Sequence, residues 1–409
     1  MTAVGQVGSY RGLTKNFWLY WSAVTTSATG TAISVVVTPL LAVITLGASP
    51  AEVAVLAGVG MVPPLLLQVV TGMWADSVTS RVQVLVVADV LRCLLTACIP
   101  ALWLAGWLTF PLLVLVSAAR AVVGVFHGAF SPAVIVQIVP ADDLVSANGK
   151  LNGTRSATDV IGQGLGGVLA SAFAPALAII ADSISFLVSA VLFSRIRVPD
   201  QPRPDSVQRR RSFSVRDVAG LAATLAGRPG LWVLVALAAA GGISETVFII
   251  FCVRTLGLSP FAIGLLLAVG AIGGVIGGFT TGWLSQRLGR WTGLFGLVAT
   301  VWALVPLTVA EPGITGVLAT INFEFAGALG GTVALANVFG QLQAGAEGGT
   351  IARVMALAGN ALQIAALLGV AAGGLLGELL GPRGAFIVAV VVLALAFLPI
   401  AVKVAKRTL

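Results

Sequence analysis

Two glutamates, Glu245 and Glu324, each lie well inside a long apolar run of the chain. Placing an ionisable residue at the depth of a bilayer costs roughly 2.5–3.5 kcal/mol on insertion scales, so its presence suggests that it is used or paired. We therefore expect one of the two glutamates to bind a proton or a cationic substrate. The alternative is a structural acid that desolvation keeps neutral and that is hydrogen-bonded.

Other ionisable residues lie in two further apolar segments. Asp159 follows Arg155 by four residues, and this spacing favours a local ion pair on one helical face. Arg120 either relays protons or contacts an anion, or it pairs with an acid on a neighbouring span. His127, the only histidine, can titrate near neutral pH, but we favour a hydrogen-bonded packing role for it.

Asp89 and Arg92 are three residues apart, and we expect a gating or structural role for them. Asp182 is expected to pack rather than to carry ions. Five amides are expected to offer hydrogen bonds inside a cavity: Asn337, Gln341, Gln343, Asn360 and Gln363. Three phenylalanines are weaker candidates for an apolar wall of that cavity: Phe248, Phe251 and Phe325.

The sequence offers little for catalysis. A hydrolase or transferase needs a nucleophile with its base, or a metal cluster. The three cysteines, Cys93, Cys98 and Cys252, lie in apolar runs without metal-ligand spacing, and no phosphate-binding loop of the form G-x-x-x-x-G-K-[ST] occurs. We expect neither an enzyme nor a cofactor, and a receptor or structural partner that transports nothing remains the alternative from another class.

Composition indicates the solvent in which the chain folds. The 409 residues are 58% hydrophobic and 9% charged, with a mean hydropathy of +1.05, whereas soluble domains carry about 25% charged residues. Lipid must therefore surround most of the chain, and only helices or closed barrels satisfy the backbone there. The long unbroken apolar runs exclude the alternation of barrel strands and predict an all-α polytopic membrane protein.

The chain divides into crossings of about 20 apolar residues each. Breaks at charges, proline and glycine predict twelve spans: 16–46, 51–75, 82–106, 109–139, 143–172, 175–197, 230–256, 260–286, 291–310, 313–343, 348–379 and 383–404. A proline- and arginine-rich segment separates the sixth span from the seventh. We therefore predict a six-helix bundle over residues 1–197, a cytoplasmic linker over 198–229 and a second six-helix bundle over 230–409.

The two halves repeat each other at nearly constant offsets. Four pairs carry the repeat: Ser49–Pro50 with Ser259–Pro260, Gly60 with Gly270, Gly72 with Gly282, and Gly166–Gly167 with Gly373–Gly374. Parallel six-span repeats about an axis along the membrane normal are one plan of secondary transporters.

Basic residues predict the orientation. The chain has 23 Lys and Arg against 15 Asp and Glu, a formal charge of +8, and the bases gather near both termini, in the central linker and after the eighth span. Cytoplasmic loops carry such an excess. We therefore predict a multi-pass protein of the inner (plasma) membrane with both termini in the cytoplasm, and we attribute the charge to topology rather than to nucleic acid.

Glycines recur every fourth residue in two spans. The eighth contains Gly270, Gly274, Gly278 and Gly282, and the eleventh contains Gly369, Gly373, Gly377 and Gly381. Four-residue spacing places each series on roughly one helical face, where small residues let backbones approach closely. This predicts tight static packing, smooth interfaces that permit rocking between bundles, or both.

Two matched turns resemble a known signature. The turn after the second span reads Gly72-Met73-Trp74-Ala75-Asp76-Ser77-Val78-Thr79-Ser80-Arg81, and its partner reads Gly282-Trp283-Leu284-Ser285-Gln286-Arg287-Leu288-Gly289-Arg290. Both resemble the G-x-x-x-D-R-x-G-R-R signature of the major facilitator superfamily. Acids and bases at such helix ends can pair across the halves and hold one conformation.

Further motifs point to one branch of that superfamily. Arg120 and Gly124 are similar to the R-x-x-x-G element of proton-coupled members. The stretch Gly162-Gln163-Gly164-Leu165-Gly166-Gly167 resembles the antiporter element G-P-x-x-G-G, with Gln163 in place of proline. Four phrases resemble the enterobactin-exporter and macrolide-efflux branch: Phe130-Ser131-Pro132-Ala133, Ala147-Asn148, Asp182-Ser183-Ile184-Ser185-Phe186 and Arg353-Val354-Met355-Ala356. In the first span, where that branch often has Gly-Asp, this chain has Gly30-Thr31.

The resemblance covers essentially the whole chain and implies the major facilitator fold. It implies export of an amphipathic drug, macrolide-like compound, siderophore or secondary metabolite by proton antiport, through a monomer whose halves rock around a midplane cavity between spans 1, 2, 4, 5, 7, 8, 10 and 11. The alternative is an importer of a nutrient or lipid. The expected gating residues are Gly72, Asp76, Arg81, Asp89, Arg92, Gly282, Arg287 and Arg290, and the expected proton or substrate residues are Arg120, His127, Arg155, Asp159, Glu245 and Glu324.

Overall fold

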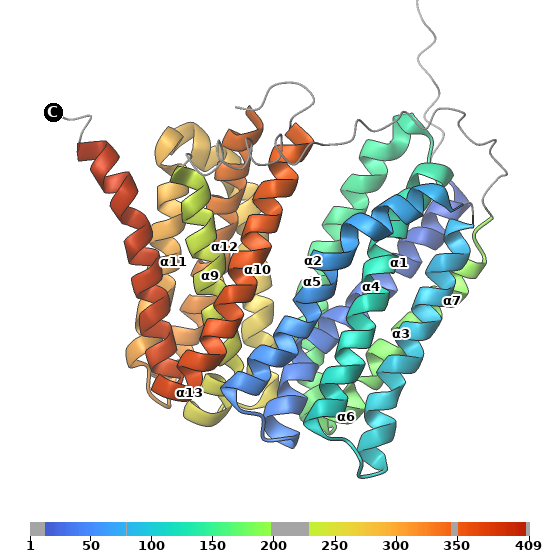
Figure 1. The fold of residues 1–409 in the computed structure, drawn as a ribbon, viewed down its shortest axis with the longest axis horizontal. Helices are drawn as coiled ribbons and strands as arrows, with labels where there is room; N and C mark the ends of the chain where they lie inside the picture. Colours follow the sequence, from blue (N-terminus) through green and yellow to red (C-terminus); the bar gives the residue numbers. More distant parts are fainter. Residues whose placement is uncertain (1–12, 79, 198–228, 345–350, 406–409) are drawn as a thin grey trace, which may run out of the picture.

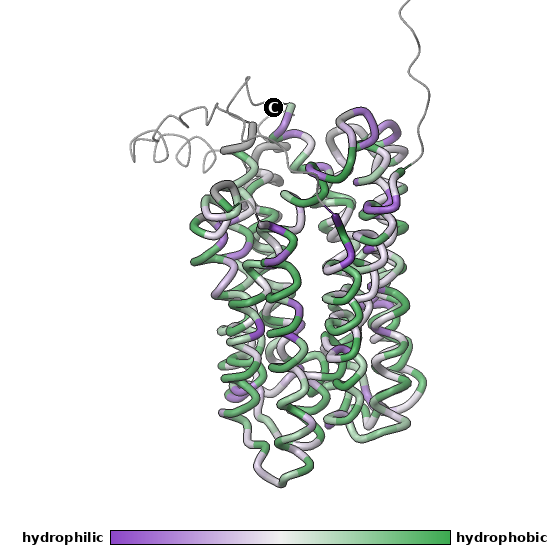
Figure 2. The backbone as a smooth tube through the Cα atoms, turned by 90° about the vertical axis from the view of Figure 1, so that its right-hand side faces the viewer, coloured by the Kyte–Doolittle hydropathy of each residue, from purple (hydrophilic) through white to green (hydrophobic). Residues whose placement is uncertain are grey.

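A computed structural model describes residues 13–78, 80–197, 229–344 and 351–405. Within these ranges every regular element is helical. Ten of the described helices are long and apolar enough to cross a membrane. The apolar colouring runs along most of the length of the helices (Figure 2). The predicted all-α membrane fold is therefore confirmed.

The helices form two groups that lie side by side (Figure 1). The first group contains α1 (Lys15–Leu40) with its π-helical continuation η1 (Leu41–Thr45), α2 (Pro50–Ser77), α3 (Arg81–Leu104), α4 (Phe110–Ile138), α5 (Leu144–Ala172), α6 (Pro175–Ala178) and α7 (Ile180–Ser194). The second contains α9 (Pro229–Ile250) with its π-helical continuation η3 (Phe251–Thr255), α10 (Pro260–Leu288), α11 (Thr292–Val309), α12 (Ile314–Ala344) and α13 (Ile351–Ala405). Both groups follow the predicted order of elements.

The described helices are consistent with twelve crossings. Helix α5 is as long as its neighbours but is not among the ten apolar helices. Helix α13 is long enough for two crossings and contains a kink at Gly381, where φ is 71°. Glycine adopts this left-handed conformation without the penalty of a Cβ atom. Residues 198–228 lie outside the described residues, so the boundaries of the linker stay a prediction.

The same loop is built twice, as the sequence repeat predicted. Ser49 Oγ accepts the backbone N–H of Glu52 at the start of α2, and Ser259 Oγ accepts that of Ala262 at the start of α10. In each case proline follows the cap and takes the first helical position, where its missing N–H costs nothing. A π-helical turn, η1 or η3, precedes each loop.

The two groups meet mainly through two pairs of helices, α5 with α10 and α2 with α13. We call the side on which α1 begins and α13 ends the terminal side, and the other the far side (Figure 1). Near the far side, a Cβ atom on Gly167 would lie 2.7 Å from Gly264 Cα and 2.8 Å from the Pro260 carbonyl oxygen. A Cβ atom on Gly374 would lie 3.3 Å from the Pro50 carbonyl oxygen. In each of the two contacts, the start of a helix that begins with proline in one half therefore packs against a glycine of the other half.

The glycine series prove to have different roles. In α13, Gly369 and Gly373 approach the backbone of α9, Gly377 lies against both Val247 of α9 and Pro50 of the other group, and Gly381 forms the kink. In α10, Gly273 and Gly277 pack against α12, whereas Gly274 and Gly278 of the predicted series line a cavity. Close packing is therefore confirmed for three of the four glycines in the α13 series, and in α10 it falls mainly on the neighbouring positions Gly273 and Gly277.

Candidate functional site

A cavity of about 1750 Å³ lies between the two groups. Its walls come from α1, α2, α4 and α5 on one side and from α9, α10 and α12 on the other, with single residues from α3 and α13 and two from α11. On α5 the wall spans residues 153–163 and on α10 it spans 267–279. Both stretches lie on the terminal side of the contact between Gly167 and Gly264. The cavity is therefore closed toward the far side.

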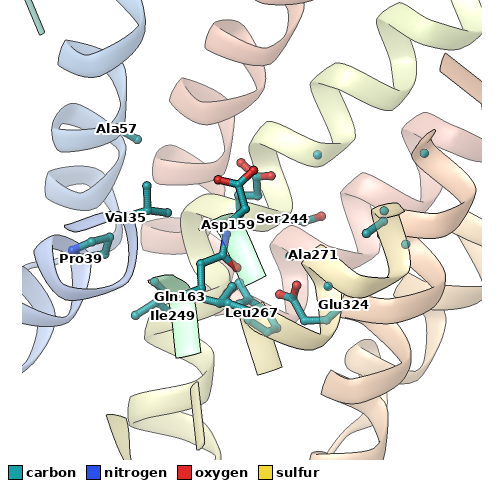
Figure 3. Close-up of a pocket in the computed structure, with 18 of the residues that line it drawn as sticks. Val35, Pro39, Ala57, Asp159, Gln163, Ser244, Ile249, Leu267, Ala271 and Glu324 are labelled. Atoms are coloured by element: carbon teal, nitrogen blue, oxygen red, sulfur yellow. The ribbon is translucent and has the colours of Figure 1, made fainter. Parts of the chain in front are cut away.

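Glu324 and Glu245 both lie in the wall of this cavity. Glu324 lies on α12 (Figure 3), and its carboxylate approaches Gly270 of α10. Glu245, on α9, presents an exposed side chain to the cavity. Within the described part of the chain, neither carboxylate has a hydrogen bond or an ion pair. The hydrogen bond that the alternative of a structural acid requires is thus not formed by any described residue, and the roles of the two glutamates stay predictions.

Helix α5 contributes Asp159 and Gln163 to the opposite wall (Figure 3). The predicted ion pair between Arg155 and Asp159 does not form among the described contacts, although both side chains are exposed. Arg155 is absent from the cavity wall and lies close enough to Tyr20 and His127 to influence both electrostatically. The two side chains diverge because the i,i+4 spacing fixes a helical face but leaves the rotamers free.

Arg120 forms an ion pair with Asp182 of α7, with 2.6 Å between Nη2 and Oδ2. Asp182 is fully buried, and it also accepts a hydrogen bond from Ser34 Oγ of α1. Asp182 therefore has a structural place, as expected, and its carboxylate also forms an ion pair at the point where α1, α4 and α7 meet, which the sequence analysis did not assign to it. Arg120 and Ser34 face the cavity in front of this acid. The alternative of an ion pair on a neighbouring span is therefore the one observed for Arg120.

A second set of polar contacts in the same group surrounds the fully buried Asp89. Asp89 Oδ1 lies 3.7 Å from Arg92 Nη1 and 3.5 Å from His127 Nε2, and Asp89 Oδ2 accepts a hydrogen bond of 2.6 Å from Ser189. The Arg92 guanidinium also stacks on the Phe186 ring at 3.9 Å. The structural role predicted for Asp89 and Arg92 is thus present, and their gating role stays a prediction.

The antiporter-like element on α5 performs two packing tasks. Gly162 and Gly166 approach the backbone of α1, while Gly167 meets α10 across the groups. Gln163, which replaces the proline of the family pattern, faces the cavity instead. The element therefore places a polar amide beside the inter-group contact.

The matched signature turns lie at the terminal-side ends of α2 and α10. Arg81 Nε donates to the Ala75 carbonyl oxygen at 3.0 Å, and the Arg287 guanidinium lies 4.7 Å from the Trp283 ring centroid. A Cβ atom on Gly72 or on Gly282 would have no neighbour within 4 Å. The side chains of Asp76 and Arg290 lie outside the described part of the structure. The gating role of these turns stays a prediction.

The polar and aromatic lining differs from the prediction. Phe248 lines the cavity, but Phe251 is fully buried, and the aromatic partner of Phe248 is Phe323, with ring centroids 5.0 Å apart. The predicted amides are absent from the wall: for example, Asn360 accepts a hydrogen bond of 3.1 Å from Gln68 of α2. Ser34 and Phe323 were missed. The sequence analysis singled out only residues near them, Gly30-Thr31 in the span of Ser34 and Glu324 beside Phe323.

In the described residues, no group of three or more His, Cys, Asp and Glu side chains could hold a metal ion. The cavity is large and mostly apolar, with a few charged groups in its wall. Such a chamber suits a small organic molecule.

Comparisons with known proteins agree with this architecture. The family model described as Major Facilitator Superfamily matches residues 20–352. A crystal structure of the nucleoside transporter NupG has a TM-score of 0.78 at 11% identity, covering 94% of this chain and 99% of that one. A bacterial homologue of the human lysosomal transporter Spinster, inward-facing and unoccupied, has a TM-score of 0.71 at 17% identity, covering 95% and 96%. A bacterial homologue of the iron transporter ferroportin, inward-facing, has 0.69 at 18%, covering 94% and 99%. No curated protein matches the sequence significantly.

Proposed function

Because the chain belongs to the major facilitator superfamily of membrane transporters, we propose that it exports an amphipathic small molecule in exchange for protons. The two halves alternate between an opening on the terminal side and an opening on the far side. The terminal side faces the cytoplasm, as the predicted excess of basic residues on that side supports. The described conformation is then the inward-open one.

The observation that carries this proposal is the pair of unpartnered carboxylates in the cavity wall. Glu245 and Glu324 lie on neighbouring helices of one half, and each is close enough to affect the other electrostatically. An unpaired carboxylate in an apolar wall is costly. A proton or a cationic group relieves that cost, and exchange of one for the other at the same site couples their movements.

Cells that express the chain test the proposal directly. A panel of amphipathic dyes and antibiotics is loaded, and extrusion is followed with and without an uncoupler. We expect extrusion that the uncoupler abolishes, and we expect Glu324→Gln and Glu245→Gln each to remove the dependence on the proton gradient. Glu311→Gln, an exposed position on the far side, is the matched control. Wild-type extrusion in both cavity variants would overturn the coupling role.

Import of a nutrient or lipid is the second candidate, because the same fold also occurs in NupG, which is described as a nucleoside transporter, and the fold alone does not fix the direction of transport. The two directions are separated with everted vesicles. An exporter accumulates its substrate in everted vesicles when their interior is acidic. An importer coupled to protons accumulates the same compound in right-side-out vesicles instead.

A further inference from the structure

The charged side chains of the cavity wall are not balanced. The wall in the described structure contains five of them: Arg92, Arg120, Asp159, Glu245 and Glu324. Each arginine has a fully buried aspartate behind it, Asp89 for Arg92 and Asp182 for Arg120. The two guanidinium charges are thus neutralised inside the first half. The three acids of the wall have no such partner, so the chamber is acidic.

Glu324 is an independent indication that a ligand belongs here. Its side chain is half-buried, with the carboxylate directed at Gly270 of α10, and none of the described residues donates a hydrogen bond to it. A carboxylate without a partner in a mostly apolar wall is costly. Glu324 also faces the chamber. The missing partner is therefore one that the chamber delivers.

Asp159 brings a further negative charge to the cavity from the other half. Its side chain is exposed to the chamber from α5, one turn before Gln163 (Figure 3). Arg155 offsets the negative potential around Asp159 only from a distance, because the two side chains form no ion pair. Asp159 and Glu324 thus bring negative charge to the chamber from helices of different halves. A cation between them would be attracted to both walls.

The remaining wall is suited to the apolar part of such a molecule. Phe248 and Phe323 form a tilted aromatic pair beside Glu324, with centroids 5.0 Å apart. Aromatic faces attract organic cations. A bare metal ion is disfavoured, because no group of three suitable ligands occurs in the described residues.

We propose that the transported molecule is an amphipathic organic monocation. Its charged centre binds between Asp159 of the first half and Glu324 of the second, and its apolar body lies against Phe248 and Phe323. This inference rests on the proposed export function and narrows its substrate class. Asp159 is then the residue through which the first half contacts the bound cation.

Binding to the purified full-length chain tests the charge requirement. Radiolabelled tetraphenylphosphonium is the probe, and two competitors of equal shape are compared: an aryl-alkyl trimethylammonium and its neutral tert-butyl isostere. We expect the ammonium compound to compete at least about tenfold better than the isostere. Equal competition by the neutral isostere would overturn the proposal.

Variants locate the site. Asp159→Asn and Glu324→Gln should each weaken tetraphenylphosphonium binding about tenfold, and Asp159→Glu should restore most of it, which separates loss of charge from misfolding. Asp142→Asn, an exposed position outside the chamber, should bind like the wild type. Unchanged binding by Asp159→Asn would remove that residue from the site and overturn the proposal.

This experiment can fail independently of the proposed function. Uncoupler-sensitive extrusion of neutral compounds, without binding of tetraphenylphosphonium, would refute the cation and leave proton-driven export intact. Charge-selective binding without any proton-dependent flux would support the cation site and refute the export mechanism.

Discussion

Arg254 forms hydrogen bonds across the two halves on the far side, and its removal should shift the balance between the two conformations. Its Nη2 atom donates to the carbonyl oxygens of Gly47 at 3.0 Å and Ala48 at 2.7 Å, across the two halves. A hydrogen bond from a charged donor contributes about 1.5–3 kcal/mol. Arg254 is exposed, so we assign about 1 kcal/mol to each bond, below that range because solvent screens the charge. Arg254→Ala should therefore change the ratio of conformations by about thirtyfold, from about 2 kcal/mol.

Arg383 provides the matched control on the same side of the protein. Its Nη2 atom donates to the Ala310 carbonyl oxygen at 2.6 Å, but both residues belong to the second half. Arg383→Ala removes an arginine–carbonyl bond of the same kind without affecting the contact between halves. It should lower the melting temperature and leave the conformational ratio unchanged.

Electron–electron distance measurements between spin labels report that ratio. Labels at Val145 and Leu288 mark the terminal-side ends of α5 and α10, and Val145 is 84% exposed. Cys93 and Cys98 are replaced beforehand, whereas Cys252 is buried. The Arg254 variant should gain a population of short terminal-side distances. Equal shifts in the two arginine variants, or no shift in either, would refute the role of Arg254 in closing the far side.

Two further substitutions test the packing and the ion pair. Gly167→Val places a side chain where even a Cβ atom would lie only 2.7 Å from Gly264 Cα, so it should prevent closure of the far side and abolish transport. The control Gly128→Val should leave transport active, because a Cβ atom there has no neighbour within 4 Å. Equal transport activity of the two variants would contradict the close approach of Gly167 and Gly264. Asp182→Asn leaves Arg120 unpaired and should cost about 3–5 kcal/mol of stability, measured as a lower melting temperature. The double variant Asp182→Asn with Arg120→Gln should recover part of that loss, and no recovery would refute the pair.

The sequence repeat predicted much of the fold because its residues act locally. The Ser49–Pro50 and Ser259–Pro260 pairs cap helices through contacts only three residues away, so their consequences follow from the pattern itself. The apolar runs likewise predicted the order of the helices. The contacts between Pro50 and Gly374 and between Pro260 and Gly167 use the same repeat, but the sequence does not say that the two pairs meet across the halves.

The site was harder to predict because it depends on helix rotation. Arg120 was expected to have an acidic partner, yet the choice of Asp182 follows from how α7 turns against α4. In α10, Gly270, Gly274 and Gly278 share the same four-residue spacing as Gly273 and Gly277. Periodicity therefore could not tell the cavity face from the packing face.

Glu245 and Glu324 were found because an unpaired charge in an apolar run stands out against its surroundings. Asp159 was assigned to a local pair because the spacing to Arg155 allows one. The distinction required knowing that Asp159 faces the cavity and Arg155 does not.

The most direct test of proton exchange in the acidic chamber uses the purified chain in proteoliposomes. Vesicles with an acidic interior are diluted into alkaline buffer that contains the fluorescent organic monocation ethidium, and its uptake is followed with and without nigericin. We predict uptake that nigericin abolishes, and gradient-independent behaviour for Glu324→Gln. Uptake that ignores the pH gradient in the wild type, or that persists with full gradient dependence in Glu324→Gln, would contradict the account.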